Sequence, residues 1–258
     1  MYLNFKRHQW LIMFMMGACV PVFGQKSKSL VKRTPLTINA SRRQADLSAN
    51  QSSEPTPLKE RLVEISTDYG VMVAKLYDST PLHRDNFLKL VQQKFYDSLL
   101  FHRVISQFMI QGGDPASKDA SDSLPLGGGS APGDRISAEL RPYFFHKKGA
   151  LAAARDDNPE KASSNCQFYI VQGRAITQPD LDKIYNDRVK ASNPSFSYTK
   201  AQREIYNRIG GTPFLDQGYT VFGEVISGLD VIDKIANLPK DASDRPLQNV
   251  RMKIRLLN

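Results

Sequence analysis

The stretch that decides how this chain folds is FHRVISQFMIQGGD, residues 101–114. Its first half alternates in the manner of a β-strand, so Arg103 and Ile105 share one face. After a kink in the middle of the stretch, Met109 and Gln111 share a face as well. Together these side chains make a surface that is apolar enough to hold a ring and polar enough to grip an amide. A surface arginine beside core aromatics explains the same residues, so this stretch needs support from elsewhere in the chain.

Two later parts of the chain supply further residues of interest. Residues 149–155, GALAAAR, read as a strand whose small side chains leave a shallow groove for an extended peptide. Close strand packing at a bend of a barrel is the competing explanation. Residues 163–170, SSNCQFYI, lead into another strand, and residues 214–223, FLDQGYTVFG, form a turn that enters a strand.

In this order, the three regions resemble the cyclophilins. The first matches in its Phe-His-Arg opening and in the FMIQGGD run at residues 108–114. The second matches in its approach, rich in serine and asparagine, to residues 167–170. The third matches in its Leu-Asp pair followed by Val-Phe-Gly at residues 221–223. The resemblance covers about residues 61–257, interrupted by an insertion at about residues 178–210.

The resemblance implies a mainly β fold, a closed eight-stranded antiparallel barrel capped by two helices. It also implies peptidyl-prolyl cis/trans isomerase activity on proline-containing polypeptides, with no cofactor and no metal. By the same resemblance, Arg103 is the catalytic residue and Gln111 orients it. The residues that the resemblance assigns to substrate binding are His102, Phe108, Met109, Ala154, Arg155, Gln167, Tyr169, Phe214, Leu215 and Tyr219.

The chain departs from the family's usual pattern at four of these positions. Arg155 stands where asparagine is usual, and its charge favours acidic sequences in the substrate. Tyr169 replaces phenylalanine and adds a hydroxyl to the pocket wall. Phe214 lacks the indole N–H of the usual tryptophan, so cyclosporin-like inhibitors should bind more weakly. Tyr219 changes the rim of the pocket. None of these changes removes Arg103, so we expect activity to survive.

Periodicity and turn signals place the remaining elements. A helix should begin at Thr80 as its cap, with Pro81 in the first turn, and a second should cover residues 229–235. The polar segment 178–210 has apolar residues at helical spacing and predicts a helical insertion. The predicted strands are residues 62–65, 71–76, 99–105, 108–111, 150–155, 167–172, 221–225 and 250–257.

The first 24 residues have the pattern of a signal peptide. Lys6 and Arg7 form a positive start, and the apolar run that follows is too short to span a bilayer comfortably. We expect cleavage after Gly24 and a periplasmic or secreted product. The alternative is lipoprotein processing at Cys19, which would leave the protein anchored to the membrane.

Composition separates a tail from a globular domain. Residues 25–58 are polar with few aromatic side chains, which indicates a flexible linker, and residues 59–258 form the expected domain. The formal net charge is +9 over 258 residues, without a single basic stripe. Loss of Cys19 on processing would leave Cys166 as a lone thiol, so no intrachain disulfide is possible. We expect a monomer, with Cys166 serving packing.

Three other functions compete with the isomerase. A barrel that holds proline-containing chains but turns over poorly would use residues 178–210 as its partner surface. A nucleic-acid-binding barrel would need aromatic side chains interleaved with basic ones, a pattern that this sequence lacks. A hydrolase would need a serine partnered with a histidine and an acid, and no recognisable arrangement of this kind stands in the sequence.

Overall fold

Alternating apolar residues form the first hairpin of the structure, a computed structural model that describes residues 61–121 and 124–257. In strand β1 (Arg61–Thr67) the side chains of Val63 and Ile65 are buried, and their neighbours are at least partly exposed. Strand β2 (Gly70–Leu76) repeats this pattern and pairs with β1 along its whole length. The turn between the strands uses Gly70, whose φ of 132° is costly for other residues.

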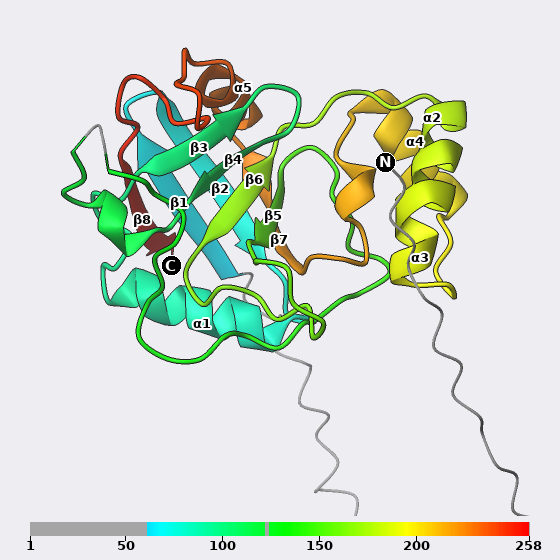
Figure 1. The fold of residues 1–258 in the computed structure, drawn as a ribbon, viewed down its shortest axis with the longest axis horizontal. Coiled ribbons are helices and arrows are strands. Elements are labelled where there is room, and N and C mark those ends of the chain that lie inside the picture. The colour runs from blue at the N-terminus through cyan, green and yellow to red at the C-terminus, as the bar shows by residue number, and fades with distance from the viewer. Residues whose placement is uncertain (1–60, 122–123, 258) are drawn as a thin grey trace, which may run out of the picture. The chain divides into compact units, whose positions relative to one another are not determined.

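Eight strands form one sheet in the order β3-β4-β6-β5-β7-β2-β1-β8, and every neighbouring pair is antiparallel. Figure 1 shows how the sheet curls. Each strand begins and ends within two residues of a predicted one. The other six strands are β3 (Phe101–Ile105), β4 (Met109–Gly112), β5 (Ala150–Ala153), β6 (Phe168–Val171), β7 (Val221–Ser227) and β8 (Met252–Leu257).

The sheet does not close into the expected barrel. Strands β3 and β8 lie at its two ends and have no ladder between them. The segments that lead into them are joined by one isolated antiparallel bridge, Leu100↔Arg251, and the backbone hydrogen bonds around it. The prediction is therefore confirmed for a mainly β fold of eight antiparallel strands, whereas the sheet itself is an open, curled half-barrel.

The segment before β8 explains why the ladder stops. It contains Pro239 and Pro246, which have no backbone N–H to donate. Asp244 between them has a φ of 65°, in the left-handed region. Its carbonyl oxygen accepts a hydrogen bond from the backbone N–H of Val104 in β3 (2.8 Å). This segment thus touches β3 at separate points and cannot run beside it as a regular strand.

Two helices pack against the sheet, as predicted. Helix α1 (Pro81–Gln92) packs against β7 and β8, and helix α5 (Leu229–Ala236) packs against β2, β3 and β4. Both helices turn an apolar face toward the sheet. In α1 this face includes the buried side chains of Phe87, Leu88 and Val91.

The start of α1 is capped differently from the prediction. Thr80 is the N-cap residue, but its hydroxyl donates to the carbonyl oxygen of Tyr77 (3.3 Å) and caps no helical N–H. The free backbone N–H groups of Leu82 and His83 donate instead to the carboxylate of Glu139, at 3.2 Å and 3.0 Å. A carboxylate at this end also complements the helix dipole. The cap therefore comes from a residue distant in sequence.

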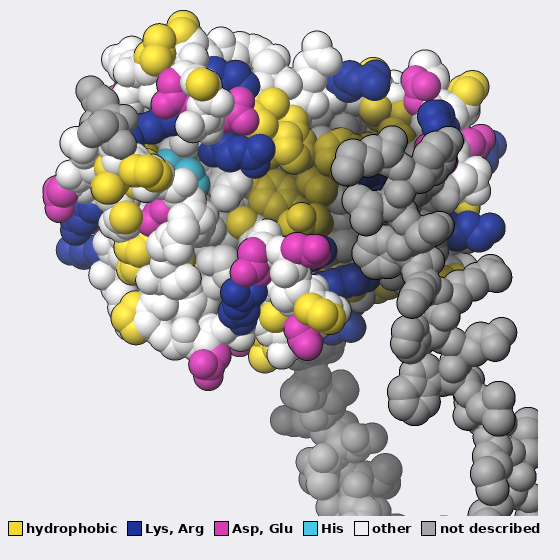
Figure 2. All heavy atoms as spheres, viewed as in Figure 1, with side chains coloured by type: hydrophobic (Ala, Val, Ile, Leu, Met, Phe, Trp, Pro, Cys, Tyr) yellow, Lys and Arg dark blue, Asp and Glu magenta, His cyan; other side chains and the backbone are white. Residues whose placement is uncertain are grey.

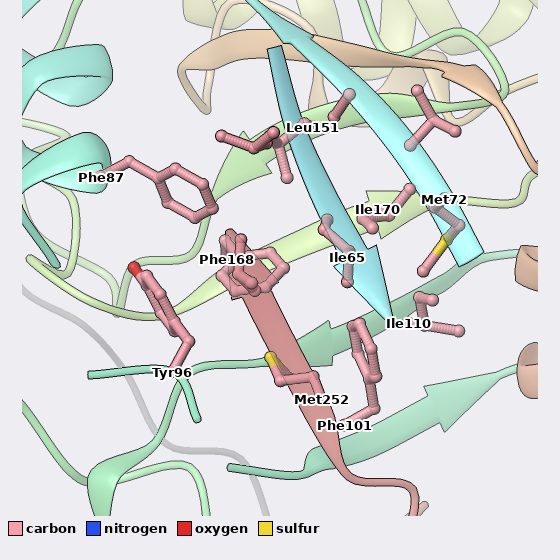
Figure 3. Close-up of a cluster of buried hydrophobic side chains, with 14 of the residues drawn as sticks. Ile65, Met72, Phe87, Tyr96, Phe101, Ile110, Leu151, Phe168, Ile170 and Met252 are labelled. Atoms are coloured by element: carbon pink, nitrogen blue, oxygen red, sulfur yellow. The ribbon is translucent and has the colours of Figure 1, made fainter. Parts of the chain in front are cut away.

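The main core lies between the curled sheet and α1. The rings of Phe87, Tyr96 and Phe168 meet there, the last two edge to face with centroids 5.5 Å apart. Figure 3 shows these rings facing aliphatic side chains of several strands. The labelled core residues are Ile65, Met72, Phe87, Tyr96, Phe101, Ile110, Leu151, Phe168, Ile170 and Met252.

The insertion at residues 178–210 is helical. It consists of α2 (Gln178–Ile184), the π-helical turn η3 (Tyr185–Val189), α3 (Lys190–Ser192) and α4 (Lys200–Arg208). It has a hydrophobic cluster separate from the main core. The buried members of this cluster are Phe145, Ile176, Leu181, Val189, Phe196, Tyr198 and Tyr206.

The predicted signal peptide, the linker at residues 25–58 and Cys19 all lie outside the described residues. Within residues 61–121 and 124–257, no helix has both the length and the apolar character needed to cross a bilayer.

Candidate active site

A cavity of about 110 Å³ opens on the outer surface of the curled sheet. Nine of the twelve residues predicted for the site line it. Figure 2 shows hydrophobic side chains gathered in a hollow on the face viewed, with Lys and Arg side chains at its edge. The lining residues are Arg103, Phe108, Met109, Gln111, Ala154, Arg155, Tyr169, Leu215 and Tyr219.

Three neighbouring strands bring the central side chains together. Arg103 of β3 is the ladder partner of Gln111 in β4, and Gln111 is in turn the partner of Tyr169 in β6. Directly paired residues of an antiparallel ladder point to the same face of the sheet. The row continues to Ala152 in β5, which is fully buried. The strand pairing thus places the arginine, the glutamine and the aromatic ring side by side.

A tight turn carries Phe108 to the cavity. Gln107 has a φ of 61° at the kink that the sequence predicts. Its backbone N–H donates to Oε1 of Gln172 (2.6 Å), which fixes the turn against the end of β6. The ring of Phe108 then packs against that of Phe214, with centroids 5.5 Å apart. Phe214 does not line the cavity and is 43% exposed beside it.

Arg103 is held differently from the expectation. Its side chain is 41% exposed, and Nε lies 3.6 Å from Oδ2 of Asp244. The side-chain N–H of Gln111, expected to orient the arginine, points elsewhere and donates to Oε1 of Gln167 (3.2 Å). Among the described residues, Asp244 is thus the ion-pair partner of Arg103. Gln111 remains at the cavity wall, where its carbonyl group can meet a bound peptide.

The side chain of Arg155 is held by contacts within the protein. Its Nε donates to the carbonyl oxygen of Gly218 (2.9 Å), and its guanidinium lies 4.5 Å from the centroid of the Tyr219 ring. Only 11% of the side chain is exposed. The arginine at this position therefore stabilises the loop that carries Tyr219. Its positive charge still lies at the cavity wall.

A second and larger cavity of about 300 Å³ adjoins the first, because Gln111, Ala154 and Arg155 line both. Of these two cavities, Gln167 lines only the larger one. Its Nε2 donates to the carbonyl oxygens of Gly127 (2.9 Å) and of Gly129 in the same loop (2.8 Å). The predicted groove residues are therefore brought together with the glycine-rich loop.

Besides Phe214, His102 is the predicted site residue that lines neither cavity. It follows Phe101 and precedes Arg103 in β3, so its side chain points to the opposite face from the arginine. It is 4% exposed, and neither ring nitrogen has a hydrogen-bond partner in the described part of the chain. Burial lowers the pKa of His102 to about 4. A neutral, buried ring is a packing element and not a substrate contact.

A serine, a histidine and an acid do meet in this chain, an arrangement missed in the sequence. Nε2 of His83 lies 3.0 Å from Oγ of Ser163, and Nδ1 lies 2.7 Å from Glu139. The three residues are far apart in sequence and carry no local motif. Ser163 is 1% exposed, so no substrate can reach its hydroxyl. His83, Ser163 and Glu139 join α1 to two loops and give no support to a hydrolase function.

The lone cysteine and the possible metal ligands also bear on the chemistry of the site. Cys166 is buried, and its Sγ accepts from the backbone N–H of Ala131 (3.2 Å). Burial raises the pKa of this thiol, as expected for a packing residue. Within the described ranges, no cluster of three or more His, Cys, Asp or Glu side chains could hold a metal ion.

Comparison with known proteins points to one family. The profile described as "Cyclophilin type peptidyl-prolyl cis-trans isomerase/CLD" matches residues 62–255. A Staphylococcus epidermidis protein named "Putative peptidyl-prolyl cis-trans isomerase" is 33% identical over 189 residues, which cover 73% of this chain and 87% of that protein. A Staphylococcus aureus protein of the same name gives the same identity and coverage.

Solved structures give the same picture of the fold. A Cryptosporidium parvum cyclophilin type peptidyl-prolyl cis-trans isomerase superimposes with a TM-score of 0.56 at 24% identity, over 77% of this chain and 98% of that chain. The same protein in the presence of the dipeptide Ala-Pro gives 0.55 at 24% identity, over 76% and 99%.

Proposed function

This chain belongs to the cyclophilin-type peptidyl-prolyl cis-trans isomerase family, and from that premise we propose that Arg103 and the cavity beside it carry the reaction. The chain is a peptidyl-prolyl cis/trans isomerase. Its substrates would be proline-containing polypeptides. The Cryptosporidium parvum structure in the presence of Ala-Pro supports this substrate class for a relative of the same fold.

The chemical problem is the rotation of one amide bond. Resonance gives the X–Pro bond a rotation barrier of roughly 18–20 kcal/mol, and uncatalysed isomerisation takes on the order of tens to hundreds of seconds. No bond has to break. Resonance is lost in the twisted state, where the prolyl nitrogen becomes pyramidal and basic. A site that binds the twisted state more tightly than either planar state therefore accelerates the reaction.

The residues at the cavity suit this task. Phe108, Met109 and Leu215 offer an apolar wall for the proline ring. Arg103 lies at the same cavity with its guanidinium partly exposed. Arginine keeps its charge throughout the pH range in which proteins fold, so it can donate to the prolyl nitrogen or the adjacent carbonyl oxygen without a proton transfer. An oriented donor in a partly dry site is most effective when it is aimed at the transition state.

One observation carries this proposal: the ladder partners Arg103, Gln111 and Tyr169 stand in a row beside an apolar cavity. The test is Ala-Pro peptide exchange followed by NMR with residues 25–258. We expect Arg103→Ala to lower kcat/KM by roughly 30- to 1000-fold, as for the loss of one oriented donor. Arg255→Ala, which removes an exposed arginine of β8, is the matched control and should keep full activity.

The result separates two functions. Near-full activity of folded Arg103→Ala would remove Arg103 from its catalytic role. No acceleration by the folded wild-type chain would favour a module that only holds proline-containing segments.

We further propose that the enzyme works outside the cytoplasm on exported proteins. The support is the signal-like composition of residues 1–24, with Lys6 and Arg7 before an apolar run. Proteins that fold after export meet slow proline steps without ATP-driven chaperones. Fractionation of cells that carry the full chain tests the location, and recovery in the cytoplasm alone would refute it. Retention in the membrane fraction that is lost in Cys19→Ala would select lipoprotein processing.

A further inference from the structure

A buried carboxylate links the helical insertion to the active site. Asp216 is 2% exposed and has four donors around it. The hydroxyls of Tyr198 and Tyr206 donate to Oδ2 at 2.6 Å and 2.5 Å. The backbone N–H of His146 donates to Oδ1 at 2.8 Å, and Nδ1 of the same residue lies 2.7 Å from Oδ1. Four donors offset the cost of burying the charge.

The same contacts fix the tautomer of His146. A carboxylate only accepts, so Nδ1 must carry the proton that is shared with Asp216. In a neutral imidazole Nε2 is then the acceptor, and the hydroxyl of Tyr169, 2.8 Å away, donates to it. His146 is 1% exposed and Tyr169 is 4% exposed. The hydroxyl that distinguishes Tyr169 thus points away from the cavity, while its ring forms part of the cavity wall.

The carboxylate also controls a second part of the wall. Asp216 directly follows the short helix η4 (Pro213–Leu215), which presents Leu215 to the cavity. The hydroxyl of Tyr198 lies 3.3 Å from the carbonyl oxygen of Pro213 as well as bonding Asp216. Both ends of η4 are therefore tied to a tyrosine of the insertion. One buried network sets the position of Tyr169 on one side and of Leu215 on the other.

Two of the four donors to Asp216, the hydroxyls of Tyr198 and Tyr206, belong to the insertion. Tyr206 lies on α4 and is completely buried, and Tyr198 precedes the same helix and is 7% exposed. Both rings are members of the insertion's own hydrophobic cluster. Their hydroxyls therefore transmit the packing of the insertion to Asp216.

We propose that Tyr198 and Tyr206 of the helical insertion are positioning residues for proline binding, acting through Asp216 and His146 on Tyr169 and η4. This inference rests on the proposed function of the cavity and adds a role for residues 178–210. The insertion is an internal support of the substrate pocket. Its tyrosines touch no substrate themselves.

The test removes single hydroxyls and keeps the rings. In Tyr206→Phe and Tyr198→Phe we expect the affinity for an Ala-Pro peptide, measured by NMR titration, to fall by about 3- to 10-fold. The exchange rate at saturation should stay within about twofold of wild type, because Arg103 is untouched. The ¹⁵N shifts of the His146 ring should also move. Tyr185→Phe is the control, since Tyr185 donates within the insertion to the carbonyl oxygen of Phe196 and does not contact Asp216.

A double-mutant cycle distinguishes positioning from general loosening. If Tyr206 acts through the Tyr169 hydroxyl, most of its effect on affinity should vanish in a Tyr169→Phe background. Equal effects of Tyr206→Phe in both backgrounds would overturn the path through His146 and Tyr169. Wild-type affinity in both single variants would overturn the whole proposal. The proposed function is tested separately by Arg103→Ala. That substitution changes the rate at saturation and leaves the hydrogen-bond network of Asp216 intact.

Discussion

At the scale of single residues, the guanidinium of Arg103 has to be aimed as well as present. Arg103 has a long flexible side chain that is 41% exposed, so an unheld guanidinium would sample many directions. Asp244 supplies a partner at 3.6 Å, pairs with Lys240 through its other carboxylate oxygen (2.6 Å), and has a φ of 65°. Asp and Asn are among the residues that tolerate this backbone region best.

The first residue-scale prediction concerns this ion pair. Asp244→Asn keeps the left-handed backbone and removes the charge. We expect kcat/KM for an Ala-Pro peptide to fall by about 3- to 10-fold, because the guanidinium loses a fixed direction. The free energy of unfolding should change by less than about 1 kcal/mol, since both side chains are partly exposed. Urea denaturation and NMR exchange measure the two quantities.

Asp230→Asn is the matched control, because it removes a carboxylate from an exposed i,i+4 pair with Lys234. It should leave catalysis unchanged. An Asp244→Asn variant that is as active as wild type would mean that substrate alone orients Arg103.

The residues of the cavity were predictable because they stand in contiguous motifs. Arg103, Met109 and Gln111 come from one short stretch whose alternation sets their shared face. The same alternation, applied to His102, would have placed that residue on the buried face. His146 and Asp216 were not predicted, since they are 70 positions apart and meet only through the fold. The partners His83 and Ser163, 80 positions apart, were missed for the same reason.

At the scale of elements, the insertion depends on a well-formed helix α4. Thr199 and Gln202 form a capping box at its start. The Thr199 backbone N–H donates to Oε1 of Gln202 (2.9 Å), and the Gln202 backbone N–H donates to Oγ1 of Thr199 (3.2 Å). The amide of Gln202 also donates to the carbonyl oxygen of Pro142, outside the insertion (2.9 Å). The cap thus both starts the helix and attaches it to the main domain.

The element-scale prediction removes half of this box. Thr199→Ala should lower the free energy of unfolding by about 1 kcal/mol, the usual cost of losing an N-cap side chain. Chemical denaturation of residues 25–258 measures the effect. Lys200→Ala is the control, because Lys200 is the next residue and its side chain is 92% exposed. It should lower the free energy of unfolding by less than about 0.5 kcal/mol. Equal midpoints for Thr199→Ala and wild type would show that Gln202 holds the helix start alone.

The elements themselves were more predictable than their closure. Alternation and glycine positions locate all eight strands, because a strand leaves a local signal of period two. Whether the first and last strands of the sheet pair is decided by the segment before β8. There, two prolines and the left-handed Asp244 interrupt the pairing. A family resemblance cannot resolve this detail.

At the scale of the whole molecule, two buried histidines couple folding to pH. Burial lowers the pKa of His102 to about 4, and burial also lowers the pKa of His83, against the opposing effect of Glu139. In the unfolded chain both should titrate near 6.5. Below that pH the two imidazoles bind protons in the unfolded state and stay neutral in the folded state. Stability is therefore complete above about pH 6.5 and falls as the pH drops toward 4.

This linkage gives a quantitative prediction for His102. Protonation of His102 in the unfolded chain should lower the free energy of unfolding by about 2 kcal/mol at pH 5 relative to pH 7.5. In His102→Gln the slope of unfolding free energy against pH, between pH 6 and 5, should become smaller by about 1.2 kcal/mol per unit. Tyr185→Phe leaves every histidine and carboxylate of the chain in place, so its slope should match that of wild type even if its stability differs.

Catalysis should not follow the same curve. Arg103 needs no proton transfer, so the rate per folded molecule should stay flat across pH 5–8 while the folded fraction declines at the acidic end. Measuring peptide exchange and folded fraction on the same samples separates the two. A bell-shaped rate per folded molecule would require a titrating acid or base at the cavity. That result would contradict a mechanism based on a permanently charged donor.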